Sequence, residues 1–317
     1  MSWGFDFRLF FDSFRRLDAG WMAASIVLVL ATYAGRALRW QAMMRPVAPH
    51  ASLWRLIENT CIGFTASVIF GRAAEIVRPL LIARAEGVTL ASQVAVWVLE
   101  RVTDLVMVLL LFGIALSGVD RSRASTVGPE VAWVLQFGGR AILTLGAAAA
   151  GVLLACRVFS GDAARWLGRW PALARFADSL AAGVAATRDA KAFALILLYT
   201  LAEWALIAAC YYCIFKGFAP TAHLTAMDSL TILGFVSFAS VVQIPGVGGG
   251  VQVAAALVLT QMFGIAAEPA VTAGILFWGI GFAVIVPLGL WFAVRGGFTF
   301  ASLRTLGKSP DRPGEIA

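Results

Sequence analysis

Long apolar segments recur along the whole chain, and they constrain its fold more than any other feature. They cover about residues 19–44, 53–70, 89–118, 131–157, 191–215, 224–243, 248–264 and 269–294. Most approach or exceed the roughly 20 residues with which an α-helix crosses a bilayer, and none shows the alternation of barrel strands. We therefore predict an all-α, polytopic integral membrane protein with about seven or eight transmembrane segments.

The composition excludes the other large classes of protein. Of the 317 residues, 60% are hydrophobic and only 14% are charged, whereas about 25% of an average soluble chain is charged. The net charge of +7 is not accompanied by any nucleic-acid recognition motif. It indicates basic cytoplasmic loops beside anionic headgroups, so we expect membrane lipids and no nucleic acid as partners.

Charge patterning divides the chain into three parts. Residues 1–18 place aromatic side chains on one helical face and charges on the other, which predicts an amphipathic helix in the membrane interface. Residues 19–294 form the transmembrane domain, which includes an amphipathic cytoplasmic connection at 160–189. Residues 295–317 form a basic polar tail.

Basic residues also predict the orientation. They are concentrated in the 157–191 connection and in the tail, whereas residues 119–131 and 216–228 are nearly balanced in charge. The positive-inside rule therefore places the first pair in the cytoplasm and the second pair outside.

Two apolar segments are followed by a break and a short helix. The first break lies at Gly71, and a charged helix follows from about Ala73 to Glu86. The second is the run Pro245-Gly246-Val247-Gly248-Gly249-Gly250, and a helix follows to Gly264. A helix of about fourteen residues is roughly 21 Å long, which is short for the hydrocarbon core of a bilayer. Each short helix can therefore cross a thinned part of the membrane or form a re-entrant segment. We interpret the two regions as a weak internal repeat, typical of transporter binding sites; the alternative is that glycine-rich loops look alike.

Ionisable residues in the middle of an apolar helix are candidates for a site, because each costs about 2.5 kcal/mol or more there. Glu100, Arg101 and Asp104 lie deep in the 89–118 segment. Two carboxylates outnumber one arginine, so a further cation is expected from Arg72 or Arg78. The cluster indicates either the wall of a lipid-headgroup cavity or a buried ion-pair network that fixes helix packing.

The two breaks carry further candidates. Arg72, Glu75 and Arg78 are spaced i, i+3, i+6 on the first short helix. The arginines and the free backbone amides there could bind a phosphate, with Glu75 orienting the arginines, although a non-specific basic patch is the alternative. The second break offers backbone amides to an anion, or serves only as a tight packing turn. The predicted substrate-binding set is therefore Arg72, Glu75, Arg78, Glu100, Arg101, Asp104, Glu203, Gln243, Pro245, Gly246, Gly248, Gly249, Gly250 and Gln252.

Other polar residues receive a structural interpretation. Arg36 and Arg39 lie near the end of the first apolar helix, where we expect them to snorkel to the headgroups. For Glu203 a structural hydrogen bond is favoured over a proton relay. No nucleophile–base pair, cofactor motif or metal-ligand cluster is present in the sequence, so we predict no enzyme activity, cofactor or metal.

Four motifs in order resemble one known family. They are YAGRALRWQAMMRP, FGRAAEIVRPLLIARAEGV, VLERVTD and SFASVVQIPGVGGGVQVAAALVLTQMFGI. They resemble the transmembrane region of lysylphosphatidylglycerol synthases, also called flippase-like or UPF0104, over about residues 19–294. The positions that match the family pattern are Arg72, Glu75, Arg78, Glu100, Arg101, Asp104, Pro245 and Gly246, whereas Gln252 stands where an acid is usual.

The resemblance implies a function in lipid handling in the bacterial inner membrane. Bifunctional relatives move an aminoacylated lipid between leaflets and attach the amino acid with a separate cytosolic domain, which we do not expect within these 317 residues. We expect this chain to bind, and to move between leaflets, an anionic phospholipid, glycolipid or polyprenyl lipid. The alternative is a non-transporting partner of a lipid-modifying enzyme or glycosyltransferase, docked through 160–189.

Overall fold

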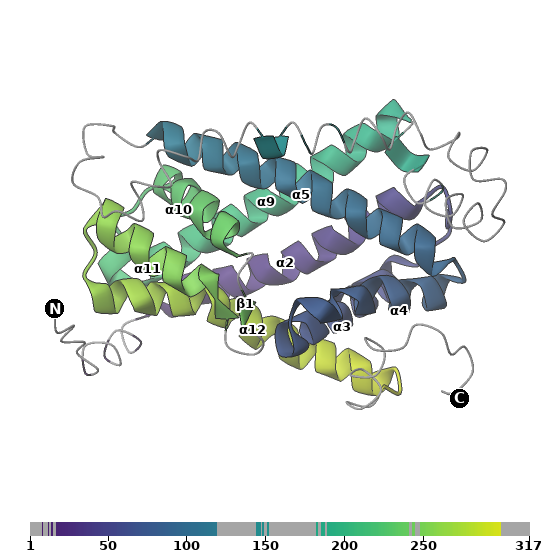
Figure 1. Ribbon diagram of the computed structural model, residues 1–317. Coiled ribbons are helices and arrows are strands. Elements are labelled where there is room, and N and C mark those ends of the chain that lie inside the picture. Colours follow the sequence, from purple (N-terminus) through teal and green to yellow (C-terminus); the bar gives the residue numbers. More distant parts are fainter. Residues whose placement is uncertain are drawn as a thin grey trace. The chain divides into compact units, whose positions relative to one another are not determined.

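The computed structural model is helical through nearly all of the residues it describes (Figure 1). The described residues are 8, 12, 14, 17–118, 144–146, 148, 151, 182, 185–187, 189–240, 243–244 and 248–298. Most of the predicted segment 131–157, the connection 160–189 and the tail, and most of the helix predicted over 1–18, lie outside them.

Four long helices form the framework. They are α2 (Ala19–Met44), α5 (Leu90–Gly118), α9 (Ala190–Gly217) and α12 (Ala267–Arg295). Helices α2, α9 and α12 are long and apolar enough to cross a membrane. Large apolar side chains such as Val27, Leu198 and Val294 are exposed along them, as expected of surfaces that face lipid.

Shorter helices form two pairs. The first is α3 (Leu53–Phe70) with α4 (Val77–Glu86), joined through Gly71 and the 3-10 helix η1 (Arg72–Ile76). The second is α10 (Ala226–Ala239) with α11 (Gly250–Phe263), joined by strands β1 (Gln243–Ile244) and β2 (Gly248–Gly249), which pair antiparallel. Within each pair the two helices pack against each other. Two further 3-10 turns are η3 (Ala185–Thr187) and η4 (Ala219–Thr221).

The two pairs share one succession of elements, in agreement with the internal repeat seen in the sequence. Each second helix stops at a left-handed glycine, Gly87 or Gly264, with φ of 66° in both. Each glycine is followed by a long helix of 29 residues, α5 or α12. The prediction of one charged helix from Ala73 is corrected in detail, because residues 72–76 wind as 3-10 helix, a common form at helix starts.

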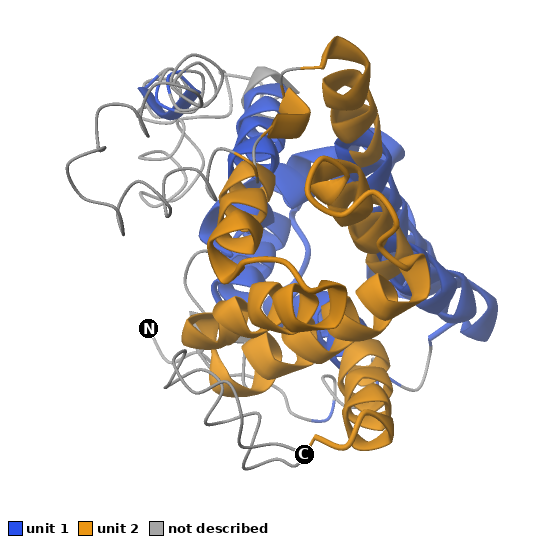
Figure 2. Cartoon of the chain, turned by 90° about the vertical axis from the view of Figure 1, so that its right-hand side faces the viewer, with its two compact units in different colours: residues 1–32, 102–153, 200–282 blue, residues 33–101, 154–199, 283–317 orange. Residues whose placement is uncertain are grey.

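The chain forms two compact units, which are described separately (Figure 2). Unit 1 comprises residues 1–32, 102–153 and 200–282, and unit 2 comprises residues 33–101, 154–199 and 283–317. Unit 2 contains the α3–α4 pair, and unit 1 contains the α10–α11 pair. Each unit also receives one part of α2, α5, α9 and α12.

Aromatic packing fills the interior of unit 1. Phe112 of α5 lies edge-on to Phe235 and stacks on Phe238 of α10, with ring centroids 5.4 and 5.1 Å away. Tyr211 of α9 stacks on Phe277 of α12 at 4.1 Å. These contacts attach the α10–α11 pair and the long helices to one core.

A glycine allows one close approach between helices in each unit, within the α3–α4 pair and between α11 and α12. In unit 2, a Cβ added at Gly63 of α3 would lie 2.9 Å from the Cα of Arg78 in α4. In unit 1, a Cβ added at Gly274 of α12 would lie 2.8 Å from the backbone oxygen of Gln252 in α11. Real Cβ atoms do not come this near to backbone, so both contacts require glycine.

Candidate functional site

Glu100 of α5 is the centre of a buried charge cluster in unit 2. Its side chain is only 1% exposed, and it lies about 15 Å along the helix. Arg39 of α2 donates from Nη2 to one carboxylate oxygen at 2.7 Å, and Arg78 of α4 donates from Nη2 to the other at 2.7 Å. Arg101 reaches the second oxygen at 3.4 Å. Three helices therefore meet at one carboxylate.

Arg78 is held by an aromatic box as well as by Glu100. Its guanidinium carbon lies 3.9 Å from the ring centroid of Trp40 and 5.3 Å from that of Phe64. The indole of Trp40 is itself fixed, because its Nε1 donates to the buried Gln93 at 2.9 Å. Within the described part of the chain, Nε of Arg78 is buried without a hydrogen-bond partner. The cation is thus oriented before any ligand arrives.

Local sequence explains why Arg78 can reach this position. It lies in the first turn of α4, where the helix macrodipole adds positive potential. Gly63 presents only hydrogen to the backbone of Arg78, so α3 and α4 come close enough to bury the side chain. The expected cation near Glu100 is therefore supplied by Arg78.

Several arginines surround Glu100 in unit 2. Four of them, Arg36, Arg39, Arg78 and Arg101, act electrostatically on its carboxylate. The sequence required a further cation beside Glu100 and Arg101, and the structure supplies Arg78, together with Arg39. Guanidinium groups are also donors that suit an anion such as a phosphate.

The predicted snorkelling of Arg39 is wrong. Its side chain is 0% exposed and bonded to Glu100, because a carboxylate from α5 is available to neutralise it inside the protein. Arg36 is partly buried, with its guanidinium carbon 4.7 Å from the ring centroid of Phe64. Arg101 differs from both, since 41% of its side chain is exposed.

The remaining acids of the candidate set belong to unit 1 or to the first break. Asp104 accepts a hydrogen bond from Nε1 of Trp204 at 3.3 Å, and the neighbouring Glu203 is 1% exposed. Glu75 lies 3.9 Å from Arg72, whose side chain is half exposed. The structure thus brings Arg78, Glu100 and Arg101 together in unit 2 and describes Asp104 and Glu203 in unit 1.

The glycine run is organised by its own backbone. Gln243 pairs with Gly249 and Ile244 with Gly248 in the two-residue ladder. The N–H of Gly249, whose φ is 137°, donates to Oε1 of Gln252 at 2.7 Å. This amide was expected to be available to an anion, and a helix cap occupies it instead. Gly250 begins α11, while Pro245 and Gly246 lie outside the described residues.

Sequence reasoning missed Arg39, Trp40 and Gln93 as parts of the cluster. One signal could have found Arg39, because Arg36 and Arg39 are the only charges in α2, three residues apart, in a helix without an acid. Such arginines need a carboxylate from another helix. Among the described residues, no group of three or more His, Cys, Asp or Glu is placed to hold a metal ion.

Comparison with known proteins gives the family of this helical chain. The family model "Lysylphosphatidylglycerol synthase TM region" matches residues 1–289. The chain belongs to this family. It is therefore a membrane protein of a family linked to lipid handling. No curated protein and no solved structure matches it.

Proposed function

We propose that this lysylphosphatidylglycerol synthase transmembrane-region protein binds the phosphate of an anionic lipid and moves the lipid between leaflets of the bacterial inner membrane. The group of arginines around Glu100, of which Arg101 is accessible, carries the proposal. Charged groups inside a membrane domain are costly, and these arginines could donate to a lipid phosphate while the lipid tails remain in hydrocarbon. Phospholipids carry such a phosphate, and so do polyprenyl phosphates and phosphorylated glycolipids.

The arginines would have different roles because they differ in solvent exposure. Arg101 is accessible and would make the first contact with the headgroup. Arg78 is stacked on Trp40 and would offer a planar, already oriented pair of donors. Glu100 would compete with the phosphate for these donors, which keeps binding weak enough for release.

Each pair of short helices would enter the membrane and return to the side from which it entered. Basic residues mark the C-terminal ends of α2, α4 and α12 and the N-terminal end of α9, namely Arg45, Arg84, Arg295 and Lys191. Acids lie at the opposite ends of α2 and α12, namely Asp18 and Glu268. By the positive-inside rule the basic ends are cytoplasmic. If α10 and α11 re-enter together, the chain crosses twice between Lys191 and Arg295, and both residues lie inside.

A leaflet-exchange assay tests the transport. The purified protein in liposomes should accelerate the exchange of fluorescent phosphatidylglycerol, and Arg101→Gln and Arg78→Ala should slow it by roughly tenfold, the loss of one charge-assisted contact. Arg84→Gln, which removes an exposed charge elsewhere, is the matched control. A thermal melt of each variant separates lost transport from lost folding. Wild-type protein that accelerates exchange of no lipid class would refute the proposal.

The alternative role as a non-transporting partner of an enzyme depends on residues 160–189. These lie almost wholly outside the described residues, so the role stays a prediction.

A further inference from the structure

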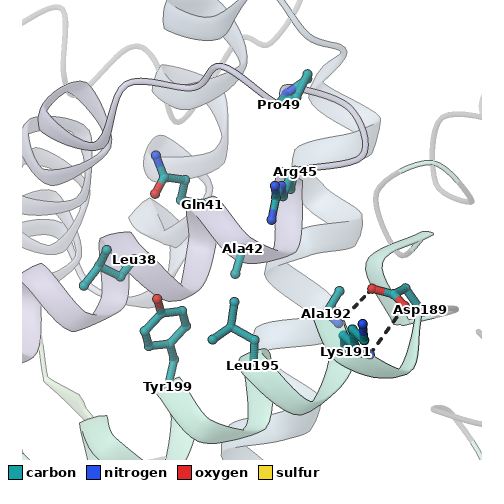
Figure 3. Close-up of a pocket in the computed structure, with 10 residues that line it drawn as sticks. All are labelled: Leu38, Gln41, Ala42, Arg45, Pro49, Asp189, Lys191, Ala192, Leu195 and Tyr199. Carbon is teal, nitrogen blue, oxygen red and sulfur yellow. Dashed lines mark hydrogen bonds between the residues drawn. The ribbon is translucent and has the colours of Figure 1, made fainter.

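A second polar site lies apart from the Glu100 cluster in unit 2. A pocket of about 510 Å³ opens between the end of α2, the turn that follows it and the start of α9 (Figure 3). Arg45 and Lys191 approach it at one end, and Leu38 and Tyr199 line the other end, with Leu195 between them. The pocket is therefore basic at one end and apolar at the other.

The two cations of the pocket have no side-chain partner among the residues that the structure describes. Neither Arg45 nor Lys191 forms an ion pair or a side-chain hydrogen bond with any residue that the structure describes. The nearby Asp189 accepts hydrogen bonds from the backbone amides of Lys191 and Ala192, at 3.4 and 3.0 Å, and so serves as the cap of α9. Two cations and one carboxylate leave one positive charge, which one phosphodiester would balance.

The apolar end indicates that the anion carries a hydrocarbon chain. Leu38 precedes Arg45 by two helical turns, and Tyr199 follows Lys191 by slightly more, so the basic and apolar ends are separated by about 10–12 Å along both helices. Both α2 and α9 are membrane-spanning candidates, and the basic end coincides with their termini, where headgroups lie. A free phosphate would contact only half of this surface.

We infer that this pocket binds the headgroup and upper acyl chain of a phospholipid with a monoanionic phosphodiester, such as phosphatidylglycerol, in the cytoplasmic leaflet. Arg45 and Lys191 hold the phosphate, and Leu38, Leu195 and Tyr199 contact the chain. The inference deepens the proposed function, on which it rests, by assigning the site at which lipid is captured before it reaches Glu100.

Native mass spectrometry of the full-length protein in detergent micelles tests the site. Wild-type protein titrated with phosphatidylglycerol should bind one molecule more tightly than it binds phosphatidylcholine. The variant Arg45→Gln/Lys191→Gln should bind phosphatidylglycerol roughly 30-fold more weakly, since each of the two basic groups beside an anionic headgroup strengthens binding about fivefold. The charge-retaining variant Arg45→Lys/Lys191→Arg should keep the affinity, which excludes misfolding as the cause. Glycerol phosphate at millimolar concentration should not displace the lipid.

The matched control is Arg84→Gln/Arg295→Gln, which removes the same charge from exposed helix ends outside the pocket. Equal losses in both double variants, or no preference for phosphatidylglycerol in wild type, would overturn the inference, and displacement by glycerol phosphate would replace the lipid with a free anion. Leaflet exchange measured on the same samples separates the two proposals. If lipid binding depends on the pocket but no lipid exchange is seen, the transport proposal is refuted and the pocket stands. If exchange depends on Arg101 but lipid binding does not depend on Arg45 and Lys191, the pocket is refuted and the transport proposal stands.

Discussion

The two pairs of short helices share a backbone plan and differ in the side chains that they carry. The α3–α4 pair contains Arg72, Glu75, Arg78, Arg84 and Glu86 within its break and second helix. In the α10–α11 pair, α11 has no charged residue, and α10 has only Asp228 in its first turn. The same succession of helix, break, helix and left-handed glycine therefore serves a charged region and a neutral one.

The difference indicates that the two close helix approaches have different roles. Gly63 brings α3 against the backbone of Arg78, so that the approach buries a cation and requires Glu100 as its counter-charge. Gly274 brings α12 against Gln252, whose side-chain oxygen caps α11. We expect electrostatic recognition in the first region and shape alone in the second, and three sets of substitutions test this contrast.

The largest effect is expected at Glu100. The substitution Glu100→Gln leaves Arg39 and Arg78 buried without a counter-charge, which should lower the free energy of unfolding by about 3–5 kcal/mol. Thermal melting in detergent measures it. Glu75→Gln, in the half-exposed pair with Arg72, should cost less than about 1 kcal/mol. Equal losses of unfolding free energy in the two variants would show that Glu100 is not the main stabilising counter-charge of the charged region.

An intermediate effect is expected at the two glycines. Gly63→Ala and Gly274→Ala should each lower the free energy of unfolding by about 1–3 kcal/mol, because the new methyl group overlaps neighbouring backbone. Only Gly63→Ala should also weaken lipid binding, since only it displaces an arginine. Gly35→Ala, which meets no atom within 4 Å in α2, should be neutral or stabilise by up to about 1 kcal/mol. Equal effects of Gly63→Ala and Gly274→Ala on lipid binding would remove the contrast.

The smallest effect is expected at the cap of α11. Gln252→Ala leaves the N–H of Gly249 without its acceptor and should cost about 1 kcal/mol. Gln252→Glu keeps an acceptor at the positive end of the helix and should retain wild-type stability. Chemical denaturation followed by circular dichroism distinguishes them. A strong loss of lipid exchange in Gln252→Glu would assign electrostatic recognition to the neutral region as well.

Helix positions could be predicted from the sequence because hydropathy and glycine are local signals. The predicted segment 53–70 coincides with α3, and the ends of α2, α5, α9 and α12 lie within two residues of the predicted ones. Both breaks and both terminating glycines were also found. The 3-10 start at Arg72 was not, since its composition does not differ from that of an α-helix.

Partners across helices could not be predicted, because they depend on tertiary placement. Arg39 and Glu100 are 61 residues apart, and Trp40 and Gln93 are 53 apart. Because Arg39 lies near the end of an apolar helix, its sequence position fits a snorkelling arginine as well as it fits a buried, ion-paired one. Likewise the sequence does not reveal that Glu100 accepts from Arg78 of α4, or that Asp104 accepts from Trp204 of α9.

The stacking of Arg78 on Trp40 has a spectroscopic consequence. A fixed cation 3.9 Å from the ring centroid shifts the energy of the excited indole, and the hydrogen bond to Gln93 keeps the ring in one orientation. Neutralising that cation with a bound anion should alter the emission maximum of Trp40. In a variant that keeps only this tryptophan, fluorescence becomes an optical titration of the site in intact vesicles, without any label.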